Sequence, residues 1–212
     1  VYAAESADSA DRLTSSEALR DLYAAARYYL DDGQPSKALV ELRAAAAAAS
    51  TPQQILQTQV ALADVLLTLG SADAAAEVLD TERDINNLSA ADSVDYLLVS
   101  GRLLAQRGNL EKASERFSAA ATAAKDSDDA VKQARASLND VRVRIEAKNL
   151  RRLDTDLHAH MALVDRLPSS AVKAELLIST GNLYQQLIRS LGYPVGLRAR
   201  AQRAFTAASQ IP

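Results

Sequence analysis

The chain of 212 residues lacks cysteine and tryptophan, and it contains only seven glycines, five prolines and 4% aromatic residues. The absence of cysteine excludes disulfides, thiolate catalysis and zinc sites built on cysteine. The small number of glycines and prolines, and of β-branched runs, argues against an all-β fold. No stretch is long and apolar enough to span a bilayer, so we expect no membrane insertion.

Alanine dominates what remains, and 48% of the residues are hydrophobic. Alanine is the best helix former, because it has no side-chain entropy to lose on folding, and its small side chain lets helices approach closely. We therefore predict an all-α chain. The net charge of -3 is mild and gives no strong bias towards nucleic acid or an anionic membrane.

Turn signals recur at regular intervals along the chain. Glycine follows a helical pattern at Gly33, Gly70 and Gly108, which are 37 and then 38 residues apart. A period in this range is typical of a repeat architecture whose unit is a helical hairpin.

The segments around these glycines share one pattern of large and small residues. The first helix of each unit has a small residue between larger ones, and the second helix carries an alanine, a large residue and another alanine. The small residues of the first helix are Ala26, Ala63 and Gly101, and the alanines of the second are Ala38, Ala75 and Ala113. We expect these small residues to let the two helices cross closely, and we expect Tyr29 and Phe117 to fill the space between neighbouring hairpins.

This pattern resembles the tetratricopeptide repeat (TPR). The resemblance implies a right-handed α-solenoid of about five helical hairpins, near residues 19–50, 56–87, 94–125, 135–167 and 174–212. Residues 1–16 are polar and acidic, and we expect them to form a flexible leader before a repeat domain at 17–212. The fourth repeat departs from the pattern, since Arg142 and Asp154 stand where small residues are expected, and the fifth contains a longer link at residues 190–196.

No constellation for catalysis is visible in the sequence. His158 and His160 are two residues apart, so on a helix they point to different faces and cannot hold one metal together. Their i,i+4 neighbours Asp154 and Asp156 are typical of charge pairs on a surface helix. There is no Gly-x-Ser-x-Gly elbow and no glycine-rich phosphate loop after a strand. We therefore expect no enzyme activity, no metal and no cofactor.

A basic stretch runs from Lys132 to Arg152, opposed only by Asp140 and Glu146. It lacks the interleaved aromatics or groove-fitting motif of a nucleic-acid site, so we expect a solvated helix face or a surface for an acidic protein instead.

The resemblance to the TPR family also implies a concave groove lined by the first helix of each hairpin. Helical spacing then assigns eight residues to this groove: Tyr23, Arg27, Gln57, Asp64, Asp95, Arg102, Asn182 and Gln185. Because Asp64 and Asp95 stand between Arg27 and Arg102, we expect a mixed-charge peptide or a helical partner rather than a clamped C-terminal carboxylate.

Two functions remain open from the sequence. The first is a non-catalytic scaffold that binds another protein or peptide, in a bacterial envelope assembly. The second is the regulatory or substrate-recruiting part of a larger enzyme, such as a caspase-like protease, because we also expect the native chain to continue past Pro212. The residues Val1 to Asp8 resemble the end of a cleaved secretory signal, which favours a periplasmic or secreted protein over a cytoplasmic one.

Overall fold

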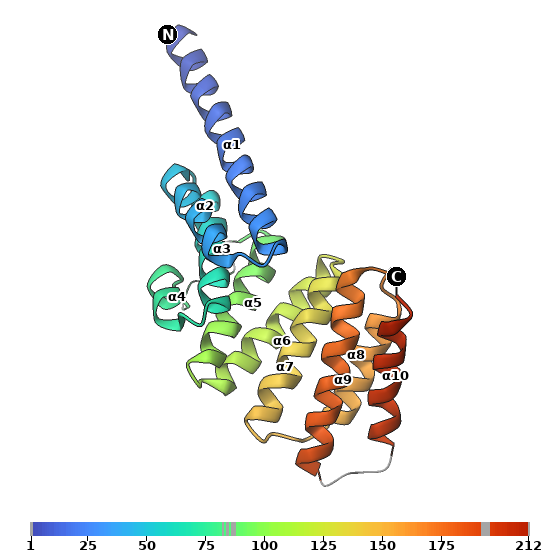
Figure 1. Ribbon diagram of the computed structural model, residues 1–212. Helices are drawn as coiled ribbons and strands as arrows, with labels where there is room; N and C mark the ends of the chain where they lie inside the picture. Colours follow the sequence, from blue (N-terminus) through green and yellow to red (C-terminus); the bar gives the residue numbers. More distant parts are fainter. Residues whose placement is uncertain (1, 82, 84, 86–87, 192–195, 212) are drawn as a thin grey trace. The chain divides into compact units, whose positions relative to one another are not determined.

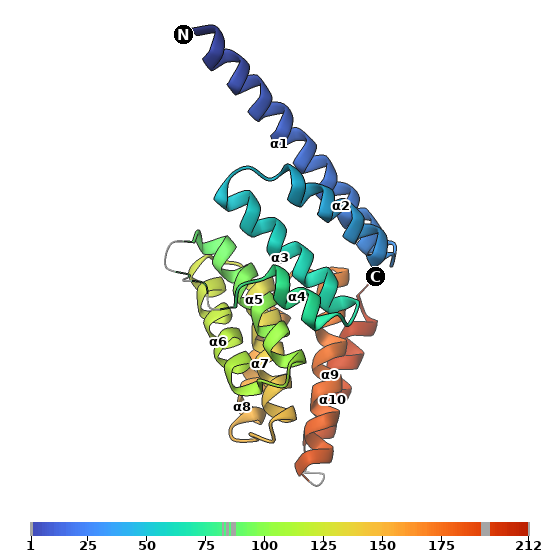
Figure 2. The ribbon, with the colours of Figure 1, turned by 90° about the vertical axis from the view of Figure 1, so that its left-hand side faces the viewer.

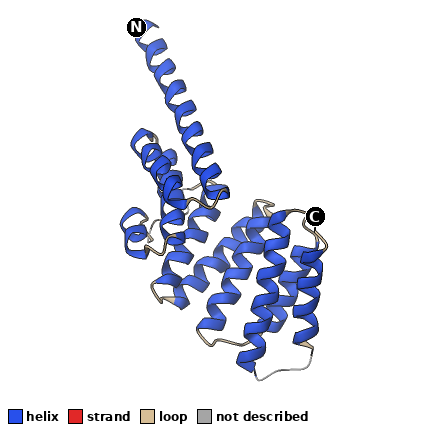
Figure 3. Ribbon diagram, in the orientation of Figure 1, coloured by secondary structure: helices blue, strands red, loops and turns tan. Residues whose placement is uncertain are grey.

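A computed structural model describes residues 2–81, 83, 85, 88–191 and 196–211; side chains are described from residue 17 on. Over these residues the chain consists of helices and loops, without a strand (Figure 3). The all-α fold predicted from the sequence is therefore confirmed. The predicted repeat ends at residues 87 and 212, and residues 192–195 of the predicted link, lie outside the described residues.

The chain divides into two units, residues 1–84 and 85–212, which are described separately. The boundary falls near the end of the second predicted repeat, so the predicted repeat domain at 17–212 spans both units. In the first unit, consecutive helices pack against one another (Figures 1 and 2). They are α1 (Tyr2–Asp31), α2 (Pro35–Ala48), α3 (Pro52–Thr68) and α4 (Ala72–Val78).

Within its described residues the second unit contains six helices, and each also packs on the next (Figure 1). They are α5 (Ala90–Gln106), α6 (Leu110–Asp126), α7 (Ala130–Glu146), α8 (Leu153–Asp165), α9 (Ala171–Leu191) and α10 (Leu197–Ser209). The first helices of its three hairpins are neighbours as well, because α7 contacts both α5 and α9. Each of the five predicted repeats overlaps one consecutive pair of helices.

Helix α1 begins earlier than the sequence analysis predicted. Residues 2–16, predicted as a flexible leader, form its first half, and no break occurs at residue 17. The physical reason is that no glycine or proline stands between Val1 and Asp32 to end a helix, while alanine is frequent there.

The predicted turns end the first helices with a left-handed residue. Gly33, Gly70 and Gly108 have φ of 69°, 75° and 78°. At the third turn the amide of Asn109 donates to the carbonyl of Leu104, as in a Schellman motif. In the fourth hairpin Lys148 takes the same place with φ of 58°, and the amide of Asn149 donates to the carbonyl of Arg144.

Two hairpins are closed by a phenylalanine that lies on a glycine. A Cβ at Gly101 would come within 2.7 Å of the Phe117 ring, and one at Gly181 within 2.6 Å of the Phe205 ring. Phe117 also packs with Val143 of α7, so it joins its own hairpin and the next one. In the first hairpin the pair is Ala26 with Leu42, which share one buried cluster.

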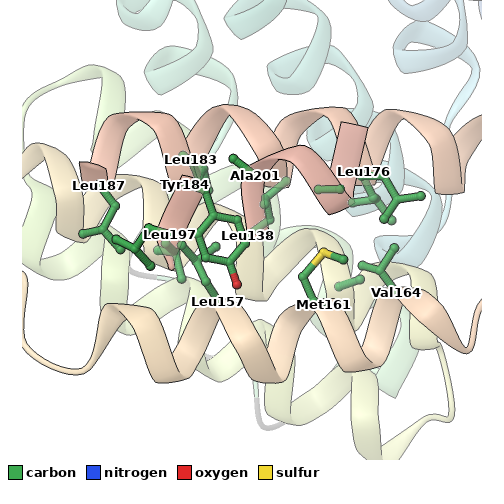
Figure 4. Close-up of a cluster of buried hydrophobic side chains, with 14 of the residues drawn as sticks. Leu138, Leu157, Met161, Val164, Leu176, Leu183, Tyr184, Leu187, Leu197 and Ala201 are labelled. Carbon is green, nitrogen blue, oxygen red and sulfur yellow. The ribbon is translucent and has the colours of Figure 1, made fainter. Parts of the chain in front are cut away.

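A large cluster of buried side chains in the second unit lies between α7, α8, α9 and α10 (Figure 4). Leu157, Met161 and Val164 of α8 face the leucines of α9. Apolar residues of α10 pack in the same cluster. The prediction that Arg142 occupies a small-residue position was wrong by one residue: Val141 is buried, and Arg142 is exposed. Asp154 is half-buried and forms an ion pair with Arg200 of α10.

Candidate functional site

The eight residues predicted to line the groove fall into two groups of four, one in each unit. Tyr23, Arg27, Gln57 and Asp64 lie on α1 and α3 of the first unit, and Asp95, Arg102, Asn182 and Gln185 lie on α5 and α9 of the second. All are on first helices, as predicted, and each group is described within its own unit.

In the first unit, Tyr23 mainly holds two helices together. Its hydroxyl lies 2.7 Å from Oγ1 of Thr58, and Thr58 in turn donates to the carbonyl of Gln54 at 2.7 Å. Since the Thr58 proton is used there, Tyr23 is the donor that links α1 to α3. Burial raises the pKa of Tyr23. Tyr23 is half-buried, so only part of its side chain is left to meet a partner.

The other three residues of the first unit present polar groups. Arg27 and Gln57 are exposed, and Asp64 is half-buried. This face therefore offers one cation, one amide and one carboxylate, which agrees with the mixed charge read from the sequence.

In the second unit, the first helices α5, α7 and α9 form a surface with an unequal charge distribution. At one side Nζ of Lys132 lies 2.8 Å from Oδ1 of Asp95, and at the other Nη2 of Arg135 lies 3.8 Å from Oε2 of Glu175. The charge of Asp95 is thus offset by Lys132. The expected repulsion of a carboxylate by Asp95 is correspondingly weaker than the sequence suggested.

Three arginines of α5 and α7 contribute positive charge to this surface. Burial lowers the pKa of the half-buried Arg102, and the positive charges of Arg142 and Arg135 lower it further. Arg135 and Arg142 themselves are exposed, on one face of α7. We call Arg102, Arg135 and Arg142 the arginine group. Their mutual repulsion favours an anionic group placed between them.

Helix α9 adds amide and apolar groups to the same surface. Asn182 and Gln185 are exposed, and Ile178, one turn earlier, is 47% exposed. Such a mixture of cationic, amide and apolar side chains can bind an acidic segment that also carries an apolar residue.

The sequence analysis assigned no groove residue to the fourth hairpin, and so missed Arg135, Asn139 and Arg142. The signal was present, because their i, i+4, i+7 spacing places three polar side chains on one face of a helix. The basic stretch from Lys132 to Arg152 had been noted, but its residues lie on different sides of α7 and in the loop after it.

The histidines do not form the surface pairs that the sequence suggested. His160 is 1% exposed, and its Nε2 lies 2.9 Å from Oγ1 of Thr180, which donates its own proton to the carbonyl of Leu176. His160 is therefore the donor to Thr180, and its Nδ1 has no hydrogen-bond partner. Burial lowers the pKa of His160 to about 4.

The carboxylates near the histidines have other partners. Asp156 forms an ion pair with Arg144, and His158 is exposed. Across the described part of the chain, no three histidine or carboxylate side chains come together as metal ligands. Nor is any helix of that part long and apolar enough to cross a membrane.

Comparison with known proteins identifies the fold. No family model and no curated protein matches the chain. Solved structures do match, and two of them come from Podosopora anserina and are described as a kinesin light chain with nearly identical TPR-like repeats. One shows 17% identity and a TM-score of 0.59 over 92% of this chain and 97% of that one. The other, a single-substitution variant of the same protein, shows 18% identity and a TM-score of 0.59 over 91% and 93%. At these identities the likeness concerns the fold, and the predicted resemblance to TPR proteins is confirmed at that level.

Proposed function

Because the chain has the helical repeat fold of TPR-like proteins, we propose that it is a non-catalytic scaffold that binds a peptide or helical segment of another protein along its first helices. TPR-like repeats generally mediate interactions between proteins, and their repeated hairpins present long surfaces for this purpose. In the second unit the binding surface comprises α5, α7 and α9.

The observation that carries this proposal is the arginine group. Arg135 lies 3.8 Å from a carboxylate oxygen of Glu175 and Arg142 donates to Asn139, but the positive charges of both still act on Arg102. A further acidic side chain placed near the three would reduce this repulsion. The partner segment would therefore carry at least one carboxylate, with an apolar residue that packs on Ile178. In the first unit the corresponding polar side chains of the first helices are Arg27, Gln57 and Asp64.

Selection of peptides from a displayed random library, followed by affinity measurement by fluorescence polarisation, tests the proposal. The variant to compare is the double substitution Arg135→Gln, Arg142→Gln, because both side chains are exposed and their loss should leave the fold intact. A matched control is Arg43→Gln, Arg166→Gln, which removes the same charge from exposed positions outside the first-helix faces.

We expect acidic peptides to be enriched, and we expect the Arg135, Arg142 double variant to bind them about tenfold or more weakly. The control variant should bind like the wild type. Selection of peptides without acidic residues, or equal weakening in both variants, would contradict the proposal. Circular dichroism establishes that all three proteins are folded.

The compartment of this scaffold, and whether it is part of a larger enzyme, stay predictions. Export to the bacterial envelope would be tested by immunoblotting of periplasmic and cytoplasmic fractions. The alternative role, as the recruiting part of a caspase-like protease, would be tested by whether the full-length protein also carries a protease domain.

A further inference from the structure

An open polar pocket lies between α6, α7 and the loop that joins α7 to α8. Its volume is about 510 Å³, which lies within the roughly 300–1,000 Å³ of small-molecule sites. Unlike most such sites it is lined by polar and charged residues alone. It is lined by Ser114, Ser118, Asp140, Arg144, Asn149, Arg151 and Arg152. We call it the loop pocket.

The loop pocket exists because the connection in the fourth hairpin is longer than in the first three. After Gly33, Gly70 and Gly108 the second helix begins two residues later, at Pro35, Ala72 and Leu110. After Lys148 it begins five residues later, at Leu153. The extra residues include Arg151 and Arg152, and Arg152 has a left-handed backbone with φ of 61°.

One arginine of the loop pocket forms its rigid base. Nη1 of Arg144 lies 2.8 Å from Oδ2 of Asp156 and 3.3 Å from Oδ2 of Asp140, and Nη2 donates to the carbonyl of Arg151 at 2.6 Å. Asp140 also accepts a hydrogen bond from Ser114. Both carboxylates near the pocket therefore have partners. The hydrogen bond from Arg144 to the carbonyl of Arg151 holds the loop that carries Arg151.

The groups that remain are mainly hydrogen-bond donors. Within the described residues, Arg151 and Arg152 form no ion pair, and both are exposed. The amide of Asn149 and the hydroxyl of Ser118 line the same space. Two guanidinium groups with an amide and a hydroxyl are the donor set that surrounds a tetrahedral oxyanion, and arginine binds phosphate through paired N–H groups.

We propose that the loop pocket binds a phosphate group, carried by a small phosphate ester or by a phosphorylated side chain of another protein. Arg151 and Arg152 donate to the phosphate oxygens, Asn149 and Ser118 complete its shell, and the remaining volume holds the group to which the phosphate is attached.

The loop pocket is separate from the surface proposed for partner binding. At about 100° of rotation per residue, Asp140 and Arg144 project from the side of α7 roughly opposite Arg135 and Arg142. Occupation of one surface therefore leaves the other accessible, and substitutions at each can be tested independently.

The test titrates inorganic phosphate into the ¹⁵N-labelled full chain and follows amide and arginine side-chain resonances by NMR, with chloride at equal ionic strength as the reference. We expect saturable shifts at residues 149–152 that chloride does not produce. The double variant Arg151→Gln, Arg152→Gln should weaken binding at least about tenfold, since two charge-assisted contacts are lost. The control Arg43→Gln, Arg166→Gln should bind as the wild type does.

A third variant separates a defined site from a general attraction of positive charge. Ser118→Tyr keeps every arginine but fills the pocket, so it should also abolish the shifts. Shifts that persist in Ser118→Tyr, or that are equal in both double variants, would overturn the proposal.

The source of the phosphate is identified by two further titrations, with glucose 6-phosphate and with a short phosphoserine peptide beside its unphosphorylated form. Tighter binding of the sugar phosphate than of inorganic phosphate assigns the site to small esters, and tighter binding of the phosphopeptide assigns it to a phosphorylated protein. Binding of the unphosphorylated peptide at the same residues would contradict the proposal.

Discussion

The contact between Gly101 and Phe117 allows a quantitative test of how the third hairpin is held together. The change Gly101→Ala adds one methyl group, which would lie 2.7 Å from the edge of the Phe117 ring. The ring is 1% exposed and packed on Val143, so it has little freedom to move away.

Two effects of opposite sign decide the outcome. Alanine is better than glycine in a helix by about 1 kcal/mol, whereas overpacking a buried site costs about 1–3 kcal/mol. Because the neighbour is a buried ring and not the end of a flexible side chain, we expect the clash to exceed the gain. Gly101→Ala should lower the free energy of unfolding by about 1 kcal/mol.

The matching change removes the clash. Phe117→Leu alone leaves a gap over Gly101 and should cost about 1–2 kcal/mol. With both changes the hairpin has the pair that Ala26 and Leu42 already form in the first hairpin, where both are 2% exposed. The loss of unfolding free energy in the double variant should therefore be smaller than the sum of the two single losses, by a coupling energy of about 1–3 kcal/mol.

Urea denaturation followed by circular dichroism measures the four proteins of this cycle. Hydrogen exchange of α5 and α6, read by mass spectrometry, shows that the losses arise in the third hairpin. Additive losses, or a Gly101→Ala variant that is more stable than the wild type, would refute this account of the packing.

Two further predictions concern the fourth hairpin. As pH falls from 6.5 to about 4, the unfolded chain takes up a proton at His160 before the folded chain does. The free energy of unfolding should therefore fall by up to about 3 kcal/mol more than in a His160→Gln variant. Urea titrations in which both proteins show the same dependence on pH would contradict this prediction. Lys148→Gly should raise the melting temperature, because a left-handed backbone costs a residue with a Cβ about 1 kcal/mol, and Gly108→Ala should lower it for the same reason. Calorimetry in which the two substitutions shift the melting temperature in the same direction would count against the turn geometry.

The fold could be predicted because its main determinants are local in sequence. Glycine at Gly33, Gly70 and Gly108 marks turns at a constant interval, and the alternation of small and large residues marks the helix crossings. The fourth hairpin was harder, since Lys148 takes a backbone conformation that usually signals glycine. The sequence signal for this turn was indirect: in Lys148-Asn149-Leu150 the last two residues are the same as in Gly108-Asn109-Leu110.

The candidate sites could be predicted only in part. Spacing along one helix places residues on the first-helix faces, as for Asn182 and Gln185. It does not show that Arg102 lies near Arg135, or that Asp95 is offset by Lys132, because those contacts join different helices. The loop pocket was missed for the same reason: Ser118 and Arg151 come from separate elements that only the folded chain brings together.

The paired sizes of Gly101 and Phe117 also limit the order in which such a hairpin can change during evolution. A chain with glycine and phenylalanine and one with alanine and leucine differ by two substitutions, and both routes between them pass through a less stable protein. The route that first replaces phenylalanine leaves a gap, which neighbouring side chains can partly fill, whereas the route that first replaces glycine forces atoms together. Because either single change is expected to cost about 1 kcal/mol or more, chains with alanine opposite phenylalanine, or glycine opposite leucine, should be rarer among homologous hairpins than the two matched pairs.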